Sequence, residues 1–296
     1  MLSPMEQKAP LLLAVSLAAG LLIGASSLRA AVLTEDFFNY TSGTSAAANN
    51  GGTGWSGSWT GVTTNGRTYS NLAGTFSAPT NYTYSTGTNY VALTAAGSSK
   101  IDYTRNLQTS IDFDPATTTT YYFSSLISVL NDGTVSSDMF FPRFRDSTST
   151  NVAAFGMNAS NRIRIVTAGG NSIDSTTVLA EGSSFATAPQ YLAIGKMVLN
   201  PSTQADEFYF SLIPVSSSIP LTEPTTWTVS TAQFVTGIAT QVTYTVNANG
   251  GTMNLDNFVL GDTYASVIPE PQTAVLLGLG GLGVLGYLRR ARQLRR

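Results

Sequence analysis

The feature that most constrains this fold is a set of short runs in which apolar and polar residues alternate with a period of two. Such alternation places one apolar face on a pleated strand, so each run predicts a half-buried β-strand. No long amphipathic helix is visible between residues 31 and 268. The clearest alternating runs are Lys100–Leu107, Arg162–Ile165, Glu207–Leu212 and Val242–Val246.

Two more apolar runs, Tyr121–Leu130 and Tyr191–Leu199, predict central strands that are covered on both faces. Turn-forming clusters of Asn, Gly, Pro and Ser separate the runs, as in hairpin-rich proteins. The chain shows neither a composition break in this region nor a repeat of fixed period, which disfavours solenoids and propellers. We therefore expect an all-β fold, a single antiparallel β-sandwich of jelly-roll type, over residues 31–264.

Residues 1–30 have the organisation of a secretory signal peptide. Lys8 precedes the apolar run Ala9–Gly24, and small residues follow it. The run is short for a membrane-spanning helix, which needs about 20 residues, so cleavage is favoured over an uncleaved anchor. The sequence thus predicts a signal-peptide helix and an exported body.

Residues 265–296 contain three features in a fixed order. Pro269, Glu270 and Pro271 form a stiff, extended tripeptide, because each proline fixes its own backbone and restricts the residue before it. The uncharged stretch Gln272–Leu288 follows, and it is at the short end of what can span a bilayer as a helix. An arginine cluster comes next. Its members Arg289, Arg290 and Arg292 predict that this end of the helix stays in the cytoplasm and that the body lies outside.

This three-part tail resembles the PEP-CTERM sorting signal of exported bacterial proteins. The resemblance implies that Pro269, Glu270 and Pro271 are recognised by an exosortase-type membrane protease. It also implies a cell-envelope protein whose precursor is anchored in the inner membrane by the C-terminal transmembrane helix. Residue types alone would indicate only a proline-marked linker before an anchor.

Three segments of the body resemble the concanavalin A-like, laminin-G-like jelly roll. The first is the opening, made of Glu35–Thr44 (EDFFNYTSGT) and Gly51–Trp59 (GGTGWSGSW); the others are Tyr191–Pro214, with its Asn-Pro turn, and Asn254–Val267, which begins NLDNF. The resemblance implies the fold of many lectins, adhesion modules and glycan hydrolases. It does not by itself assign an activity.

Two residue types needed for common catalytic chemistry are missing. The chain contains no histidine and no cysteine, which excludes Ser-His-Asp hydrolysis, histidine-ligated zinc and thiolate catalysis. Between residues 31 and 268 there are 8 basic and 15 acidic residues. This negative body argues against a nucleic-acid partner, because phosphate binding needs clustered Lys and Arg. We expect no cofactor, with bound Ca²⁺ as the one open alternative.

The acidic residues offer few candidates for a catalytic pair. Neighbours in a strand point to opposite faces, so neither Glu35 and Asp36 nor Asp206 and Glu207 can pair by themselves; solvated strand edges or turn caps are expected. Asp112 and Asp114 share a face and could contribute to a Ca²⁺ site, although a turn-forming acidic loop is favoured. Asp256 is expected to make structural hydrogen bonds.

Aromatic residues offer candidate contacts to sugars. Trp55 and Trp59 share a face if their segment is extended, so they could form a glycan-stacking platform, although core packing is the default for tryptophan. Tyr82, Tyr84 and Tyr90 fit either sugar contact or an ordinary exposed strand.

Three functions remain open after these observations. The favoured one is a non-enzymatic envelope protein associated with extracellular polysaccharide or matrix. The alternatives are a carbohydrate-active enzyme that uses carboxylates alone and a structural envelope protein without a ligand.

Overall fold

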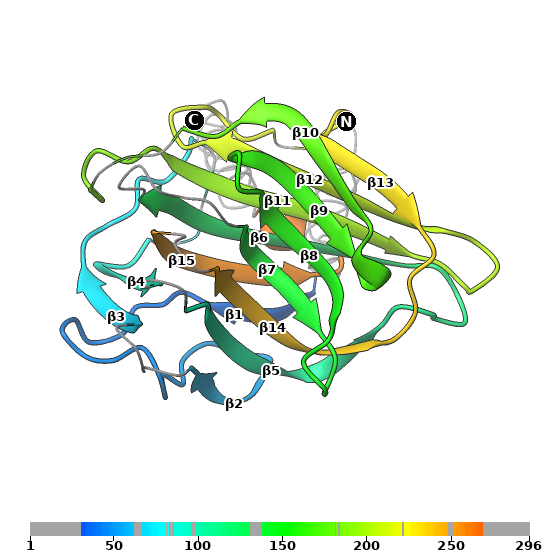
Figure 1. Ribbon diagram of the computed structural model, residues 1–296, viewed down its shortest axis with the longest axis horizontal. Coiled ribbons are helices and arrows are strands. Elements are labelled where there is room, and N and C mark those ends of the chain that lie inside the picture. Colours follow the sequence, from blue (N-terminus) through cyan, green and yellow to red (C-terminus); the bar gives the residue numbers. More distant parts are fainter. Residues whose placement is uncertain are drawn as a thin grey trace, which may run out of the picture.

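The computed structural model describes residues 31–61, 67–80, 82, 84, 86–95, 99–130, 138–180, 182, 184–220, 222–247 and 251–268. Within these residues the chain forms fifteen strands, a short 3₁₀ turn and one short helix. The strands make two antiparallel sheets that stack as a sandwich (Figure 1). The predicted all-β antiparallel sandwich is confirmed, and each of the four alternating runs falls within or largely within a strand.

The first sheet has eight strands, with β1 pairing to β15 beside the main path. In spatial order they are β13 (Val229–Gln233), β12 (Asp206–Pro214), β11 (Gln190–Leu199), β6 (Thr119–Leu130), β15 (Thr252–Gly261), β4 (Asn89–Thr94) and β3 (Thr68–Ala73), with β1 (Val32–Asp36) off the path. Strands far apart in sequence are thus neighbours. The last strand, β15, pairs with β6, with β4 and with β1.

The second sheet has seven strands. In spatial order they are β10 (Ser172–Val178), β9 (Arg162–Thr167), β8 (Asn151–Met157), β7 (Met139–Arg145), β14 (Ile238–Val246), β5 (Ile101–Asp112) and β2 (Trp55–Thr60). The turn η1 (Ala168–Gly170) joins β9 to β10. Ala168–Gly170 is one of the turn-forming clusters that separate the predicted strands, and Gly169 and Gly170 adopt positive φ angles there.

The main core lies between the sheets and is built from one face of every alternating run. On β6, Phe123 and Ile127 point into it, while Tyr122 and Leu126 point to the opposite face. Strands β6 and β11 occupy the middle of their sheet and are almost fully buried, so the prediction of central strands covered on both faces is confirmed.

A second apolar cluster covers the outer face of the eight-stranded sheet. It contains Tyr82, Tyr90, Ile219 and Val267, which come from connecting segments, from β4 and from the helix α2 (Tyr264–Val267). Tyr82 and Tyr90 are buried, so the exposed aromatic surface considered for them is wrong for these two residues. The reason is that the sheet's outer face is itself apolar and has to be covered. Contacts of the sandwich continue through Ile268.

Most of the predicted targeting sequence lies outside the described residues, namely the signal peptide at 1–30, the triplet Pro269, Glu270 and Pro271, and the topology-setting Arg289, Arg290 and Arg292. Of the predicted tail 265–296 only residues 265–268 are described, and they pack on the sandwich. Among the described residues, no helix has the length and apolar character needed to cross a bilayer.

Candidate functional site

The structure brings the two candidate tryptophans together inside the sandwich. Trp59 is fully buried, with its ring stacked on Tyr103 at a centroid distance of 4.4 Å. Trp55 lies 5.2 Å from Trp59, is half-buried, and donates from Nε1 to the backbone oxygen of Glu35. These contacts are those of core packing, and Trp59 presents no surface to a ligand.

Asp36 differs from the solvated edge or turn cap expected for it. Its side chain is 2% exposed and forms an ion pair with Arg105, Nη1 to Oδ2 at 2.7 Å. The segment Gly51–Trp59 covers this pair: Arg105 donates to the backbone oxygens of Gly51 and Gly57, and its guanidinium lies 5.0 Å from the ring centroid of Trp55. At Gly52, where φ is +75°, a Cβ would lie 1.9 Å from the backbone oxygen of Glu35, so this close approach requires glycine.

The other acidic candidates are held in turns. Asp112 and Asp114 are both exposed, and Asp112 Oδ1 accepts a hydrogen bond from the backbone N of Asp114 at 2.9 Å. Buried Asp206 accepts from the backbone N of Asn200 at 2.7 Å, while neighbouring Glu207 is exposed on the other face. Within the described part of the chain, no group of three or more acidic side chains could hold a metal ion.

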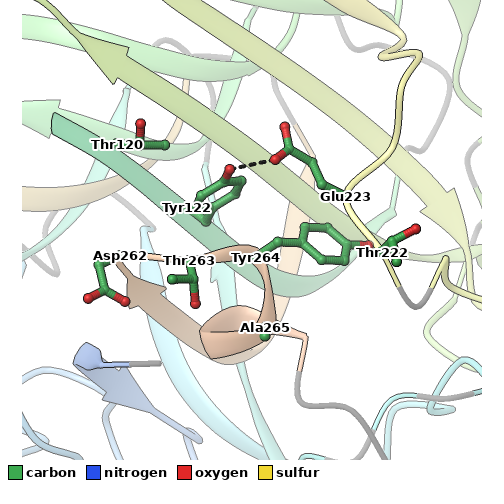
Figure 2. A pocket seen from close by; sticks show the side chains of 8 residues that line it. All are labelled: Thr120, Tyr122, Thr222, Glu223, Asp262, Thr263, Tyr264 and Ala265. Carbon is green, nitrogen blue, oxygen red and sulfur yellow. Dashed lines mark hydrogen bonds between the residues drawn. The ribbon is translucent and has the colours of Figure 1, made fainter. Parts of the chain in front are cut away.

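The structure contains an open pocket that the sequence did not single out. It lies on the outer face of the eight-stranded sheet, where β6, the segment before β13 and the end of β15 meet, and its volume is about 410 Å³ (Figure 2). Its lining combines hydroxyl groups, two carboxylates and two tyrosine rings: Thr120, Tyr122, Thr222, Glu223, Asp262, Thr263, Tyr264 and Ala265.

Glu223 is the most constrained polar group of the pocket. The hydroxyl of Tyr122 donates to its Oε2 at 2.6 Å, and Lys196 Nζ donates to its Oε1 at 2.6 Å. The carboxylate therefore links β6 and β11 to the segment before β13. Because both oxygens are engaged, the group is held in one orientation.

Aromatic rings flank this polar group. The Nζ of Lys196 lies 5.7 Å from the ring centroid of Tyr122 and 5.4 Å from that of Tyr209. Tyr209 in turn lies 5.8 Å from Trp227, which is half-buried. Tyr264 meets Tyr122 edge to face at 6.2 Å. The result is a row of rings with polar edges beside the pocket.

The two tyrosines of the pocket stay protonated at neutral pH. Burial, together with the hydrogen bond to Glu223, raises the pKa of Tyr122 well above its usual value. Burial and the nearby charge of Glu223 raise the pKa of Tyr264 to about 12. Both phenols are therefore suited to donate hydrogen bonds and not to remove protons from a substrate.

The two carboxylates of the pocket do not face each other. Figure 2 shows Glu223 and Asp262 at opposite ends, and the Asp262 carboxylate turns away from the Tyr122 ring. Asp262 Oδ1 accepts from the backbone N of Ala31 at 3.0 Å. Each carboxylate is thus engaged in a structural contact of its own.

Comparisons with known proteins assign no family to the chain. No family model matches it, and no curated protein matches it in sequence. Solved structures with some likeness include the receptor-binding domain of botulinum neurotoxin mosaic serotype C/D, at 9% identity and a TM-score of 0.40, covering 78% of this chain and 47% of that chain. The botulinum neurotoxin serotype G binding domain follows at 8% identity and a TM-score of 0.37, covering 68% of this chain and 44% of that one.

A third is the binding domain of Paraclostridial Mosquitocidal Protein 1, at 11% identity and a TM-score of 0.36, covering 60% of this chain and 40% of that chain. The chain therefore spans less than half of each of these structures. At these identities and TM-scores the likeness says nothing about what this chain binds.

Sequence reasoning missed the pocket because its members are scattered. Tyr122 lies within a run that reads as a buried strand, and Glu223 lies in a connecting segment with no motif around it. Tyr264 lies in the segment Asn254–Val267, which is distinguished only by its resemblance to a jelly roll. The one available signal was Lys196, a lone cation inside the apolar run Tyr191–Leu199, which needs a partner when its strand is central.

Proposed function

We propose that this protein is an exported, non-enzymatic envelope protein whose sandwich binds extracellular polysaccharide at the pocket around Glu223. The observation that carries the proposal is the fixed carboxylate between Tyr122 and Lys196, beside the rings of Tyr209 and Trp227. Sugars present hydroxyl groups around flat apolar faces, and a site of this kind offers both hydrogen-bonding edges and ring faces.

Binding without hydrolysis is favoured over the enzymatic alternative. Glycoside hydrolysis uses two carboxyl groups that flank one bond. In the pocket Glu223 is tied to Tyr122 and Lys196, whereas Asp262 points away and contacts the start of β1 (Figure 2). The jelly-roll class proposed from the sequence also includes many modules that only bind.

The test uses Glu223→Gln, which removes the charge and keeps the shape. We expect purified protein to bind immobilised polysaccharides. Glu223→Gln should weaken the binding affinity about tenfold or more, because the hydrogen bond from Lys196 to Glu223 and part of the one from Tyr122 depend on the negative charge. Asp112→Asn is the matched control, because it also removes a single negative charge, from an exposed position at the end of β5 in the other sheet. Equal binding by both variants would remove the pocket from the proposal. Release of reducing ends that requires Glu223 and Asp262 would establish the enzymatic alternative.

The delivery of the protein is part of the proposal. The signal peptide at 1–30 exports the body, and the tail from 265 to 296 anchors the precursor in the inner membrane until an exosortase-type protease acts at Pro269, Glu270 and Pro271. The order of triplet, uncharged stretch and arginine cluster supports this, because a bare anchor needs no triplet.

Delivery is tested with Glu270→Ala. If the triplet is recognised, full-length precursor should accumulate in the inner membrane with the sandwich still folded. If the triplet is only a spacer, processing should be unchanged, because an exposed carboxylate contributes little to stability.

A further inference from the structure

The outer face of the seven-stranded sheet collects most of the positive charge of the body. Five of the eight basic residues between 31 and 268 lie on it or beside it, namely Lys100, Arg143, Arg145, Arg162 and Arg164. Along β7 and β9 the arginines alternate with residues of the main core, such as Phe144 and Ile163. Because alternate residues of a strand point to opposite faces, the arginine side chains point away from the core. This face is on the opposite side of the sandwich from the Glu223 pocket.

Three cations on this face share the carboxylate of Asp102. Lys100 Nζ lies 2.9 Å from Oδ2, Arg145 Nη1 lies 3.2 Å from Oδ2, and Arg143 Nη1 lies 3.8 Å from Oδ1. The two arginine side chains are only 10% and 11% exposed. Asp102 thus pairs directly with two nearly buried guanidinium groups, where water screens charge poorly, while Asp138 acts on Arg143 and Asp146 on Arg145 without a direct ion pair.

The pKa values of this cluster are set by burial and by neighbouring groups. Burial lowers the pKa of Arg143 to about 10, although the charges of Asp102 and Asp138 oppose this shift and that of Arg145 adds to it. Burial raises the pKa of Asp102, but hydrogen bonds from Lys100 and Thr245 outweigh it, so the pKa lies below its usual value.

The two guanidinium groups are held in place and still have donors to offer. Arg143 donates from Nε to Asn151 at 3.0 Å and from Nη1 to Thr245 at 2.9 Å, and Arg145 donates from Nε to the backbone oxygen of Ser149 at 2.8 Å. Among the described residues, neither Nη2 group makes a hydrogen bond, and neither is fully buried.

We propose that Arg143 and Arg145 form a binding site for the oxyanion groups, carboxylate or sulfate, of an acidic polysaccharide. Arginine presents N–H groups in a fixed fork that matches such groups, and here the forks are oriented in advance by Asn151, Ser149 and Asp102. A bound oxyanion accepts hydrogen bonds from the Nη2 groups, which have no partner among the described residues. The proposal rests on the proposed function only in taking the ligand to be a polysaccharide, since the site is separate from the pocket.

The test measures binding of purified full-length protein to sodium polygalacturonate, to dextran sulfate and to neutral dextran. We expect binding to at least one of the two acidic polymers, weakened when NaCl rises from about 50 mM to about 300 mM, because salt screens exposed charges. Arg145→Gln should weaken that binding by about tenfold. Arg162→Gln, which removes an equal charge from an exposed position on β9, should change it by less than about twofold.

A second substitution separates loss of the site from loss of the fold. Arg145→Lys keeps the charge and loses the fork, so we expect an intermediate affinity with unchanged thermal unfolding. The comparison of polygalacturonate with dextran sulfate identifies which oxyanion is bound. Binding of neither acidic polymer, or equal binding by Arg145→Gln and Arg162→Gln, would overturn the proposal. If Glu223→Gln lost binding of neutral glycans and kept binding of acidic polymers, the result would bear on the Glu223 pocket and not on the arginine site.

Discussion

Two buried aspartates on neighbouring strands show how differently one fold treats the same side chain. Asp36 ends β1 and Asp256 lies in β15, and the two strands pair directly, with Asp36 opposite Phe258. Both residues are almost completely buried, at 1% and 0% exposed. Burial alone therefore does not distinguish the two side chains, but their hydrogen-bond and ion-pair partners do.

Asp36 is surrounded by donors. It accepts from the backbone N of Phe38, from the hydroxyl of Tyr40, from Nε1 of Trp59 and from Nη1 of Arg105, all between 2.6 and 2.9 Å. Burial raises its pKa above the usual value, and these hydrogen bonds and the charge of Arg105 oppose that rise. The carboxylate thereby ties the segment after β1 to β2 and β5.

Asp256 has far fewer partners. Its Oδ1 accepts from the backbone N of Asn257 at 2.9 Å, whereas Oδ2 has no well-aligned partner. Burial raises its pKa to about 8, so the folded protein holds this carboxyl mostly protonated at neutral pH. A buried aspartate thus serves as a charged anchor where cations and donors converge, and as a neutral group where they do not.

Replacing each aspartate by asparagine should distinguish the two, and the larger change in stability is expected at Asp36. Asp36→Asn leaves Arg105 buried without a counter-charge and should cost about 3–5 kcal/mol of unfolding free energy. Urea unfolding monitored by tryptophan fluorescence measures this. Glu35→Gln, at the half-exposed neighbouring position, should stay within about 0.5 kcal/mol of the parent. If Asp36→Asn were as mild as Glu35→Gln, the ion pair would not anchor the segment.

A smaller effect, of opposite sign, is expected for Asp256→Asn. The folded carboxyl keeps its proton up to about pH 8, whereas the unfolded one loses it near the usual aspartate pKa of 3.8. Between these pH values the folded state binds more protons, so the stability of the parent protein falls as pH rises, by at most about 1.4 kcal/mol per unit. Asparagine cannot ionise and removes this loss.

Thermal unfolding from pH 5 to pH 9 tests this expectation. The advantage of Asp256→Asn over the parent should grow with pH and reach about 2–3 kcal/mol, less than the full linkage because buried sites relax. Asp112→Asn, at an exposed turn, should show no such trend. A pH-independent difference between parent and Asp256→Asn would mean that Asp256 is charged throughout.

The smallest effect removes a single donor from Asp36. Tyr40→Phe deletes the hydroxyl that donates to Asp36 and accepts from the backbone N of Gly51 at 2.9 Å. Because the acceptor is a charged group, the cost should be about 1.5–3 kcal/mol. Tyr84→Phe deletes a hydroxyl bonded to the neutral backbone oxygen of Ser266 at 2.6 Å and should cost about 1 kcal/mol. Equal costs would indicate that Asp36 carries no charge.

Much of the fold followed from local pattern. Alternation along Arg162–Ile165 and Val242–Val246 predicted strands and their buried faces, because a strand's side-chain period is set by its backbone. The apolar runs Tyr121–Leu130 and Tyr191–Leu199 predicted central strands for the same reason. The sequence alone also defines the two proposed targeting segments, since composition and order carry them.

Only the tertiary structure decided which residues distant in sequence contact one another. The donors to Asp36 come from positions 38 to 105, and the pocket joins Tyr122, Glu223 and Asp262 across connections that no local pattern specifies. Core packing was the default expectation for Trp59, which lies in the main core between the sheets. Tyr82 and Tyr90 were expected on an exposed strand, but connecting segments cover this face of the eight-stranded sheet and bury them. The physical reason is that backbone geometry is local, whereas burial and charge pairing depend on which strands become neighbours.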